Sequence, residues 1–303
     1  MKLIITGASG FIGTNIIRIL RGKYDFIVLT THPDKAYRLF PRGVDILRWD
    51  GKTIPSLDKI NDQNYAFINL AGHNIADGRW TEKKKKLITQ SRLDAANAVA
   101  DFVRSSPAKP EIIIQASAIG YYGSRADELL DELSEKGKGF LSDLCDQLES
   151  IIADLENHSV RYANCRISLV LGSDGGALPK LAKPFKYYLG GKLGSGSQWM
   201  SWIAVNDLVN AIDFLIENKE QKGTYNFSAP EPVTNADFTG ILSKTINTPA
   251  VMTVPLFVLK ALFGQMAQET ILSSQRVLPK RLLDAGFEFR YNHIAQALKQ
   301  YLQ

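Results

Sequence analysis

Short apolar runs alternate with helical repeats through the first half of the chain. The segment Phe11–Arg21, for example, places Ile12, Ile16 and Leu20 on one face of a helix. The other elements predicted here are helices at Thr81–Arg104 and Gly139–Asn157 and strands at Lys2–Thr6, Phe26–Thr30, Val44–Arg48, Tyr65–Leu70, Glu111–Ala116 and Val160–Ile167. Because these strands have no polar face and are separated by helices, they predict an α/β fold with a doubly wound parallel sheet covered on both faces.

The second half of the chain changes character. Glycine-rich loops occupy residues 172–176 and 190–196, and from Asn235 onward the apolar spacing is helical and punctuated by prolines. The elements predicted between these features are helices at 177–188 and 207–217 and a strand at 224–227. We therefore expect two parts: a sheet domain of residues 1–165, to which 205–228 returns, and a smaller, mostly helical lobe of residues 166–204 and 229–303.

Composition and charge narrow the classes of partner. Hydrophobic residues make up 45% and charged residues 22% of the 303 positions, which is typical of a soluble globular protein. A net charge of +5 over this length does not indicate a nucleic-acid partner. We expect no membrane partner, because the longest late apolar stretch, Val251–Phe263, is interrupted by Pro255 and Lys260. With no signal peptide at the start, and only Cys145 and Cys165 as cysteines, a cytoplasmic location is expected.

Three glycines lie between the first predicted strand and the first predicted helix. Gly7 permits a tight turn out of the strand, Gly10 omits a Cβ that would obstruct a pyrophosphate, and Gly13 lets the helix approach the sheet. The pyrophosphate would then meet the free N–H groups at the start of the helix. This spacing, in this place, predicts a Rossmann-type dinucleotide-binding domain. The residues of the turn expected to contact the dinucleotide are Gly7, Ser9, Gly10, Phe11, Ile12 and Gly13.

The end of the second predicted strand carries no acidic residue. Enzymes that are selective for NAD usually have Asp or Glu there, and its carboxylate binds the ribose hydroxyls. This chain instead has Thr30, Thr31 and His32, three side chains that can hydrogen-bond a 2′-phosphate. The expected cofactor is therefore NADP, with NAD as the alternative.

Two further segments are expected to border the dinucleotide. Asp50 follows the third predicted strand, where it either accepts a hydrogen bond from the adenine amino group or closes a turn before Gly51. Leu70, Ala71 and Gly72 follow the fourth predicted strand, where small residues allow the backbone to run alongside the cofactor.

The order of these motifs resembles the extended and atypical branches of the short-chain dehydrogenase/reductase superfamily. The glycine triplet is followed by Asn69–Gly72 and then by Ser117–Gly123, as in that superfamily. The features similar to a bacterial group of nucleoside-diphosphate-sugar epimerase-like proteins are Gly78-Arg79-Trp80, Ser91-Arg92, Trp202 and residues 278–290. The resemblance covers essentially the whole chain and implies an NAD(P)-binding epimerase or dehydratase fold.

The resemblance also implies a catalytic Tyr–Lys pair, which this chain lacks. In extended members the Lys lies four residues after the Tyr and lowers its pKa, and the Tyr exchanges a proton with the substrate during hydride transfer. Aligning Glu149 with the glutamate of these members places Leu141 at the Tyr position and Cys145 at the Lys position. Neither side chain can perform this chemistry.

Other polar residues are candidates to replace the missing pair. Ser117 is expected to end the fifth strand and face the nicotinamide, although Ala118 is the alternative in this alignment. Tyr121 and Tyr122 carry hydroxyls in the following loop, and the alternative role for both is packing as half-buried aromatics. Arg166, near the end of the sixth strand, is expected to border the cofactor, since a buried Arg must be paired or bind an anion.

Two functions are open from the sequence. One is an NAD(P)-dependent, epimerase/dehydratase-like oxidoreductase acting on a small polar substrate, such as a nucleotide sugar, with Ser117, Tyr121 and Tyr122 as catalytic groups. The other is a catalytically inactive NADP(H)-binding redox sensor or protein-interaction module. No metal is expected, because the four histidines have no ligand spacing. The resemblance allows a homodimer paired through Thr81–Arg104.

Overall fold

The computed structural model describes residues 1–57 and 64–303. Within them, the centre of the molecule is a seven-stranded sheet with the order β12-β7-β5-β4-β1-β2-β3, in which all neighbouring strands are parallel. Its strands are β1 (Lys2–Thr6), β2 (Asp25–Thr30), β3 (Val44–Arg48), β4 (Tyr65–Asn69), β5 (Ile112–Ala118), β7 (Tyr162–Ile167) and β12 (Gly223–Phe227). The order reverses between β1 and β4, which is where Rossmann folds bind dinucleotides. The predicted fold class is confirmed.

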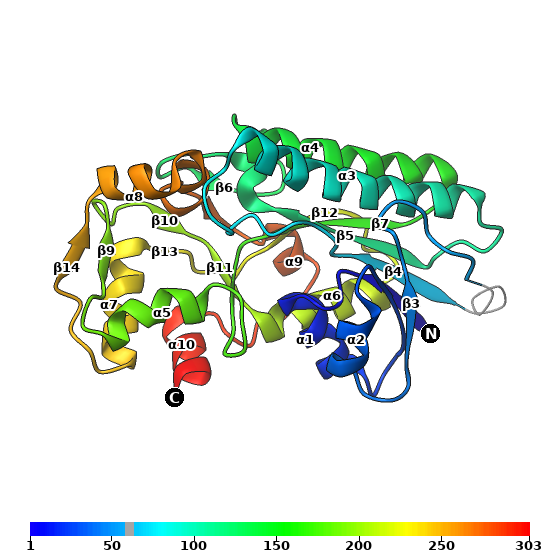
Figure 1. Ribbon diagram of the computed structural model, residues 1–303, viewed down its shortest axis with the longest axis horizontal. Helices are drawn as coiled ribbons and strands as arrows, with labels where there is room; N and C mark the ends of the chain where they lie inside the picture. Colours follow the sequence, from blue (N-terminus) through cyan, green and yellow to red (C-terminus); the bar gives the residue numbers. More distant parts are fainter. Residues whose placement is uncertain (58–63) are drawn as a thin grey trace.

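Helices cover both faces of this sheet (Figure 1). The helices α1 (Phe11–Leu20), α2 (Pro33–Leu39) and α6 (Val205–Glu217) lie on one side, and α3 (Glu82–Ser105) and α4 (Phe140–Ala153) lie on the other. Ile16 and Leu208 belong to the core on the first side, and Val99 and Ile152 to the core on the second. This burial of one apolar stripe per helix is what the spacing in the sequence predicts.

A smaller lobe occupies the end of the molecule farthest from the N-terminus (Figure 1). Its helices are α5 (Leu178–Lys186), α7 (Asn235–Thr245), α8 (Leu256–Phe263) and α10 (Ile294–Leu302). Short strand pairs join its segments: β9 (Gly191–Leu193) with β14 (Met252–Val254), and β10 (Trp199–Met200) with β13 (Val233–Thr234). Trp202, Phe238 and Leu298 lie in a separate core at this end.

Further short elements connect the lobe to the sheet. They are β6 (Leu129–Leu130) with β15 (Arg276–Val277), β8 (Leu169–Leu171) with β11 (Trp202–Ala204), and α9 (Lys280–Asp284). Single helical turns lie at Ile119–Tyr122 and Asp154–His158, and a π-helical turn at Ala267–Ile271.

The structure contains several short elements that were not predicted from the sequence, and two of these differences are informative. The helix α2 was not among the predicted elements, although Pro33 at its first turn favours a helix start. The region from Asn235 onward was predicted as helical, yet it contains β14 and β15. That part of the prediction is wrong because each of these strands pairs with a segment far away in the chain, and local periodicity carries no such signal.

Candidate functional site

The glycines of the first turn have two different physical roles. Gly7 has a φ of +68°, and a Cβ on it would lie 2.6 Å from the carbonyl oxygen of Leu70. A Cβ on Gly13 would lie 2.5 Å from the Cα of Ala8. Both are therefore required by the packing of the chain itself. Gly10 differs, because a Cβ there would approach only the Gly7 carbonyl oxygen, at 3.3 Å, and no other described atom outside its chain neighbours lies within 4 Å.

The start of α1 is suited to an anion. Gly10 is its N-cap, no side chain caps the helix, and its first turn holds no acidic residue. The first N–H groups of the helix therefore lack side-chain acceptors, and the helix dipole adds partial positive charge. Ser9 and Ile12 are half-buried beside the exposed Gly10. The cradle fits a diphosphate, since a side chain at Gly10 would fill it.

The ring of Phe11 is held by the second glycine-rich loop. A Cβ on Gly172, Gly175 or Gly176 would lie 2.6 to 2.8 Å from a ring atom of Phe11. The loop at 172–176 therefore closes over the start of α1, and it brings the smaller lobe's first segment next to the cradle.

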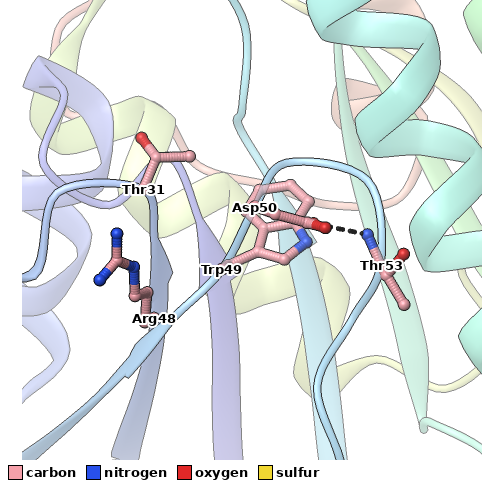
Figure 2. A pocket seen from close by; sticks show the side chains of 5 residues that line it. All are labelled: Thr31, Arg48, Trp49, Asp50 and Thr53. Carbon is pink, nitrogen blue, oxygen red and sulfur yellow. Dashed lines mark hydrogen bonds between the residues drawn. The ribbon is translucent and has the colours of Figure 1, made fainter.

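A cavity of about 490 Å³ lies at the ends of β2 and β3 (Figure 2). It is lined by Thr31, Arg48, Trp49, Asp50 and Thr53. Arg48 is exposed and forms no ion pair with a described residue, and its guanidinium lies on the same side of the cavity as Thr31 (Figure 2). Arg48 was missed by the sequence reasoning. Its signal is a basic residue at the last position of an apolar strand that neighbours β2.

The polar residues predicted at this end are partly occupied by local contacts. The Thr30 hydroxyl accepts a hydrogen bond from the His32 backbone N–H at 3.1 Å, and Thr31 Oγ1 lies 2.7 Å from His32 Nδ1. Asp50 Oδ1 accepts from the backbone N–H groups of Lys52 and Thr53, both at 2.8 Å. These two bonds lower the pKa of Asp50. Asp50 therefore closes a turn and keeps its second oxygen without a partner among the described residues.

Three strands are tied together where β4 ends. The Thr6 hydroxyl donates to Asn69 Oδ1 at 2.6 Å, and Asn69 Nδ2 donates to Gln115 Oε1 at 2.7 Å. These residues lie in register on β1, β4 and β5. The Ala71 N–H approaches Asn69 Oδ1 at 3.4 Å, so the Asn69 side chain also positions the segment that follows β4. The network fixes the strand ends on both sides of the reversal in strand order.

A buried ion pair lies at β7, the strand next to β5 in the sheet. Glu149 from α4 contacts Arg166 from β7, with Arg166 Nη2 2.8 Å from Glu149 Oε2 and both side chains less than 10% exposed. The Ser117 hydroxyl donates to Glu149 Oε1 at 2.6 Å. Burial lowers the pKa of Arg166, but the hydrogen bonds and charge of Glu149 outweigh it, so the pKa is raised. Both Ser117 and Arg166 are thus engaged within the protein.

Tyr122 is part of the same network. Its hydroxyl donates to Asn226 Oδ1 at 2.7 Å and accepts from Arg166 Nη1 at 2.9 Å, and the side chain is fully buried. Burial raises the pKa of Tyr122 to about 12, against the opposing effect of the Arg166 charge. The strand register brings these side chains together, because Arg166 on β7 lies opposite Ser117 on β5 and opposite Asn226 on β12.

Tyr121 is placed differently from Tyr122. The Cζ of Arg166 lies 3.4 Å from the centre of the Tyr121 ring, and the two tyrosine rings meet edge to face at 5.4 Å. The Tyr121 hydroxyl has no hydrogen bond to any described residue, and the side chain is half-buried. Of the three predicted catalytic hydroxyls, it is the one that the folded chain leaves unengaged within the described ranges.

The positions that correspond to the superfamily's Tyr and Lys lie on α4. Leu141 is buried, and a Cβ on Gly120 would lie 3.0 Å from its Cβ. The Cys145 sulfur lies 3.6 Å from the carbonyl oxygen of Ala118. Burial, together with the nearby Glu149 charge, raises the pKa of Cys145 to about 11, so the thiol is neutral at physiological pH. Neither position supplies a proton carrier or a cation.

The helix α3 brings a positively charged side chain close to the Cys145 position. Arg92 of α3 donates through Nη1 to the carbonyl oxygens of His73 and Ile88, at 2.9 and 3.2 Å. Its guanidinium lies against Gly72, where a Cβ would be 2.8 Å from Arg92 Cζ. Burial lowers the pKa of Arg92, and its charge acts on Cys145. No described carboxylate pairs with it. The charge that the Lys position lacks is thus present nearby, on a different element.

Comparison with known families identifies the family of this chain. Residues 3–228 match the NAD dependent epimerase/dehydratase family. This chain belongs to that family. Residues 254–301 match a separate domain of unknown function. Relatives include the epimerase family protein SDR39U1 homolog of Arabidopsis thaliana chloroplasts, 38% identical over 100% of this chain and 87% of its own length. The epimerase family protein ML0860 of Mycobacterium leprae is 34% identical over 97% and 93%.

Two solved structures have the same fold as this chain. Human epimerase family protein SDR39U1, determined with NADPH, superposes with a TM-score of 0.88, 29% identity and 99% coverage of both chains. UDP-glucose 4-epimerase of Thermotoga maritima superposes with a TM-score of 0.78 at 14% identity, covering 99% of this chain and 98% of its own. The second likeness concerns the fold alone.

Two further observations bear on the class of protein. Over residues 1–57 and 64–303, no group of three or more metal-binding side chains comes together. In the same ranges, no helix has the length and apolar content needed to cross a bilayer. The cytoplasmic location expected from the sequence stays a prediction.

Proposed function

We propose that this chain binds NADP(H) across the ends of β1 and β4. The single observation that carries the proposal is the uncapped start of α1, where Gly10 leaves open space over free N–H groups. The turn at Gly7 and the close packing of α1 on Ala8 at Gly13 hold this cradle against the sheet. The NADPH found with the human relative supports the same reading.

Selectivity for the 2′-phosphate is assigned to the cavity beside β2 and β3. Arg48 supplies a positive charge there with no acidic partner among the described residues, and Thr31 adds a hydroxyl. Guanidinium groups bind phosphate oxygens through charge-assisted hydrogen bonds. Neither Thr31 nor His32, which directly follow β2, is an acidic residue that could hold free ribose hydroxyls, whereas Thr30 and His32 provide polar contacts. The second oxygen of Asp50 remains available for the adenine amino group.

The reaction proposed is oxidoreduction of a small polar substrate near Tyr121. The bound dinucleotide would supply the hydride-transfer chemistry. Tyr121 is proposed as the proton-exchanging group, because its hydroxyl is the one not engaged in the folded chain. Arg92 is proposed to orient polar or anionic substrate groups, since it carries an unpaired charge beside Gly72. Ser117, Tyr122 and Arg166 would then act by holding the Tyr121 ring and the strand ends.

A second candidate function is favoured by a specific observation. Ser117 and Tyr122 are committed to Glu149, Arg166 and Asn226, while Leu141 and Cys145 are apolar or neutral. A protein that retains the dinucleotide cradle and lacks a second proton carrier would serve as an NADP(H)-binding redox sensor or interaction module. A homodimer through α3 and the division into two domains remain proposals alongside either function.

Turnover and binding distinguish the two functions. Purified protein is mixed with NADPH and a panel of aldehydes and ketones, and absorbance of the reduced nicotinamide is followed. The enzyme proposal expects oxidation of NADPH that Tyr121→Phe lowers about a hundredfold or more while NADPH affinity is retained. Tight NADPH binding with no turnover across the panel would reject the enzyme and support the sensor.

A further inference from the structure

The apolar stretch Val251–Phe263 is too short to span a bilayer, yet much of it lies on the surface. Val251 is 79% exposed and Phe257 is 73% exposed, and Met252, Leu256 and Leu262 are also exposed. Only Leu259 of α8 is buried. Exposed apolar groups that gather in one place commonly mark an interaction surface.

A second segment extends this surface. Tyr187, Tyr188 and Leu189 follow α5 and are each at least 60% exposed. They lead directly into Gly190, whose carbonyl oxygen accepts from the Met252 N–H, and β9 then pairs with β14. Leu256 packs against Gly194 of the same segment. We call the combined surface the outer face, made of Tyr187, Tyr188, Leu189, Val251, Met252, Leu256 and Phe257.

The two chain segments that carry the outer face hold charge of one sign. Residues 175–206 and 238–268 contain no Asp, Glu or Arg. Their charged residues are Lys180, Lys183, Lys186, Lys192, Lys244 and Lys260. All six are exposed, and none forms an ion pair with a described residue. The chain has 36 basic and 31 acidic residues, so without these six lysines it would have 30 basic residues and 31 acidic ones. These six lysines therefore exceed the chain's net charge of +5.

We propose that the outer face docks on an anionic membrane surface. Exposed aromatic and aliphatic side chains can enter the headgroup boundary, and lysines can place their charge among anionic headgroups while their stems stay apolar. A second copy of this chain is the poorer occupant, because two such faces would bring six unpaired lysines against six. The proposal concerns surface contact and not a span. It replaces the expectation of no membrane partner, because the exposure of these side chains is visible only in the structure.

Vesicle sedimentation tests the proposal directly. The full-length protein is incubated with vesicles of phosphatidylcholine alone or of phosphatidylcholine mixed equally with phosphatidylglycerol, at low and at raised salt. Docking predicts sedimentation with the mixed vesicles, little with phosphatidylcholine, and release by salt. Absence of binding to the mixed vesicles at low salt would overturn the proposal, as would equal binding to both kinds.

Surface variants identify the face that binds. Lys186→Gln with Lys192→Gln should weaken partition into the anionic vesicles roughly thirtyfold, since two lysines near the lipid are lost. Phe257→Ser should weaken it as well, whereas the controls Arg42→Gln and Leu133→Ser, at exposed positions outside the face, should not. Retained NADPH binding or an unchanged melting curve shows that each variant is folded. Equal effects of face and control variants would reject the outer face. Self-association that Phe257→Ser abolishes in analytical ultracentrifugation, without vesicle binding, would assign the face to a second copy.

Discussion

Arg166 and Glu149 form an ion pair in which both side chains are buried, 5% and 9% exposed, with Nη2 2.8 Å from Oε2. The pair lies under the loop that carries Tyr121 and Tyr122, and it joins β7 to α4. A buried pair stabilises little against an apolar alternative, but removing one partner leaves an uncompensated charge. We infer that the main role of the pair is to fix the position of the Tyr121 ring, over which Arg166 lies.

Glu149→Gln should destabilise the protein by about 3–5 kcal/mol, because it leaves Arg166 buried without its carboxylate. Chemical denaturation measures this cost. The double variant Glu149→Gln with Arg166→Met should recover a large part of the loss, since no buried charge remains. A single variant as stable as the parent would show that water reaches the pair.

The two tyrosines should separate activity from stability. Tyr122→Phe removes a buried hydroxyl that bonds Asn226 and Arg166, and should cost about 1–3 kcal/mol in unfolding free energy. Tyr121→Phe should leave stability unchanged and lower any turnover of NADPH about a hundredfold or more. Parallel melting curves and rate measurements test this. A reversal of the two effects would reassign the proton-exchanging group to Tyr122.

Arg48→Met should weaken NADPH binding by roughly ten- to a hundredfold, which is the contribution expected of charge-assisted hydrogen bonds. NADH affinity should change little, because NADH lacks the 2′-phosphate. Arg42→Met, on the loop before β3, is the matched control. Fluorescence titration of both reduced dinucleotides gives the ratio. Equal losses for NADPH and NADH would remove Arg48 from phosphate recognition.

The Cys145 thiol should make stability fall at alkaline pH. Burial raises its pKa from 9.0 to about 11, so the folded protein keeps the proton more strongly than the unfolded chain. The stabilisation is complete below about pH 9 and is lost as the pH rises through about 11. The difference in melting temperature between the parent and Cys145→Ala should therefore narrow over this interval. A constant difference would mean that the thiol is accessible to water when folded.

The sequence predicted those parts of the molecule that local patterns determine. The strands of the sheet and the turn of Gly7, Gly10 and Gly13 follow from periodicity and from the conformational freedom of glycine. The short strands β14 and β15 could not be predicted, because their partners are remote in the chain. The fold class and the layers of helices could therefore be predicted from local patterns. The short strand pairs of the smaller lobe could not, because they depend on contacts between remote segments.

The candidate site shows the same division. Ser117, Tyr121, Tyr122 and Arg166 were recognised as polar residues near the strand ends, but which hydroxyl is left unengaged depends on register across β5, β7 and β12. Arg92 and Arg48 reach the site from α3 and β3, and only the three-dimensional arrangement shows what they face. Side-chain direction between remote elements is information that a single sequence does not carry.

Gly10→Val should abolish dinucleotide binding and leave the fold intact, because the added side chain would fill the cradle and meet no protein atom closer than 3.3 Å at its Cβ. Gly13→Val is the informative contrast, since its Cβ would lie 2.5 Å from Ala8 and should destabilise the fold. Circular dichroism and NADPH fluorescence together test the pair. Unaltered NADPH binding in folded Gly10→Val would place the dinucleotide elsewhere.

Isothermal titration of the purified protein with NADPH, NADP⁺, NADH and NAD⁺ tests the central claim most directly. The uncapped start of α1 and the Arg48 cavity predict saturable heat with the two phosphorylated dinucleotides, and weaker binding of the other two. Folded protein that gives no heat with any of the four would contradict the account.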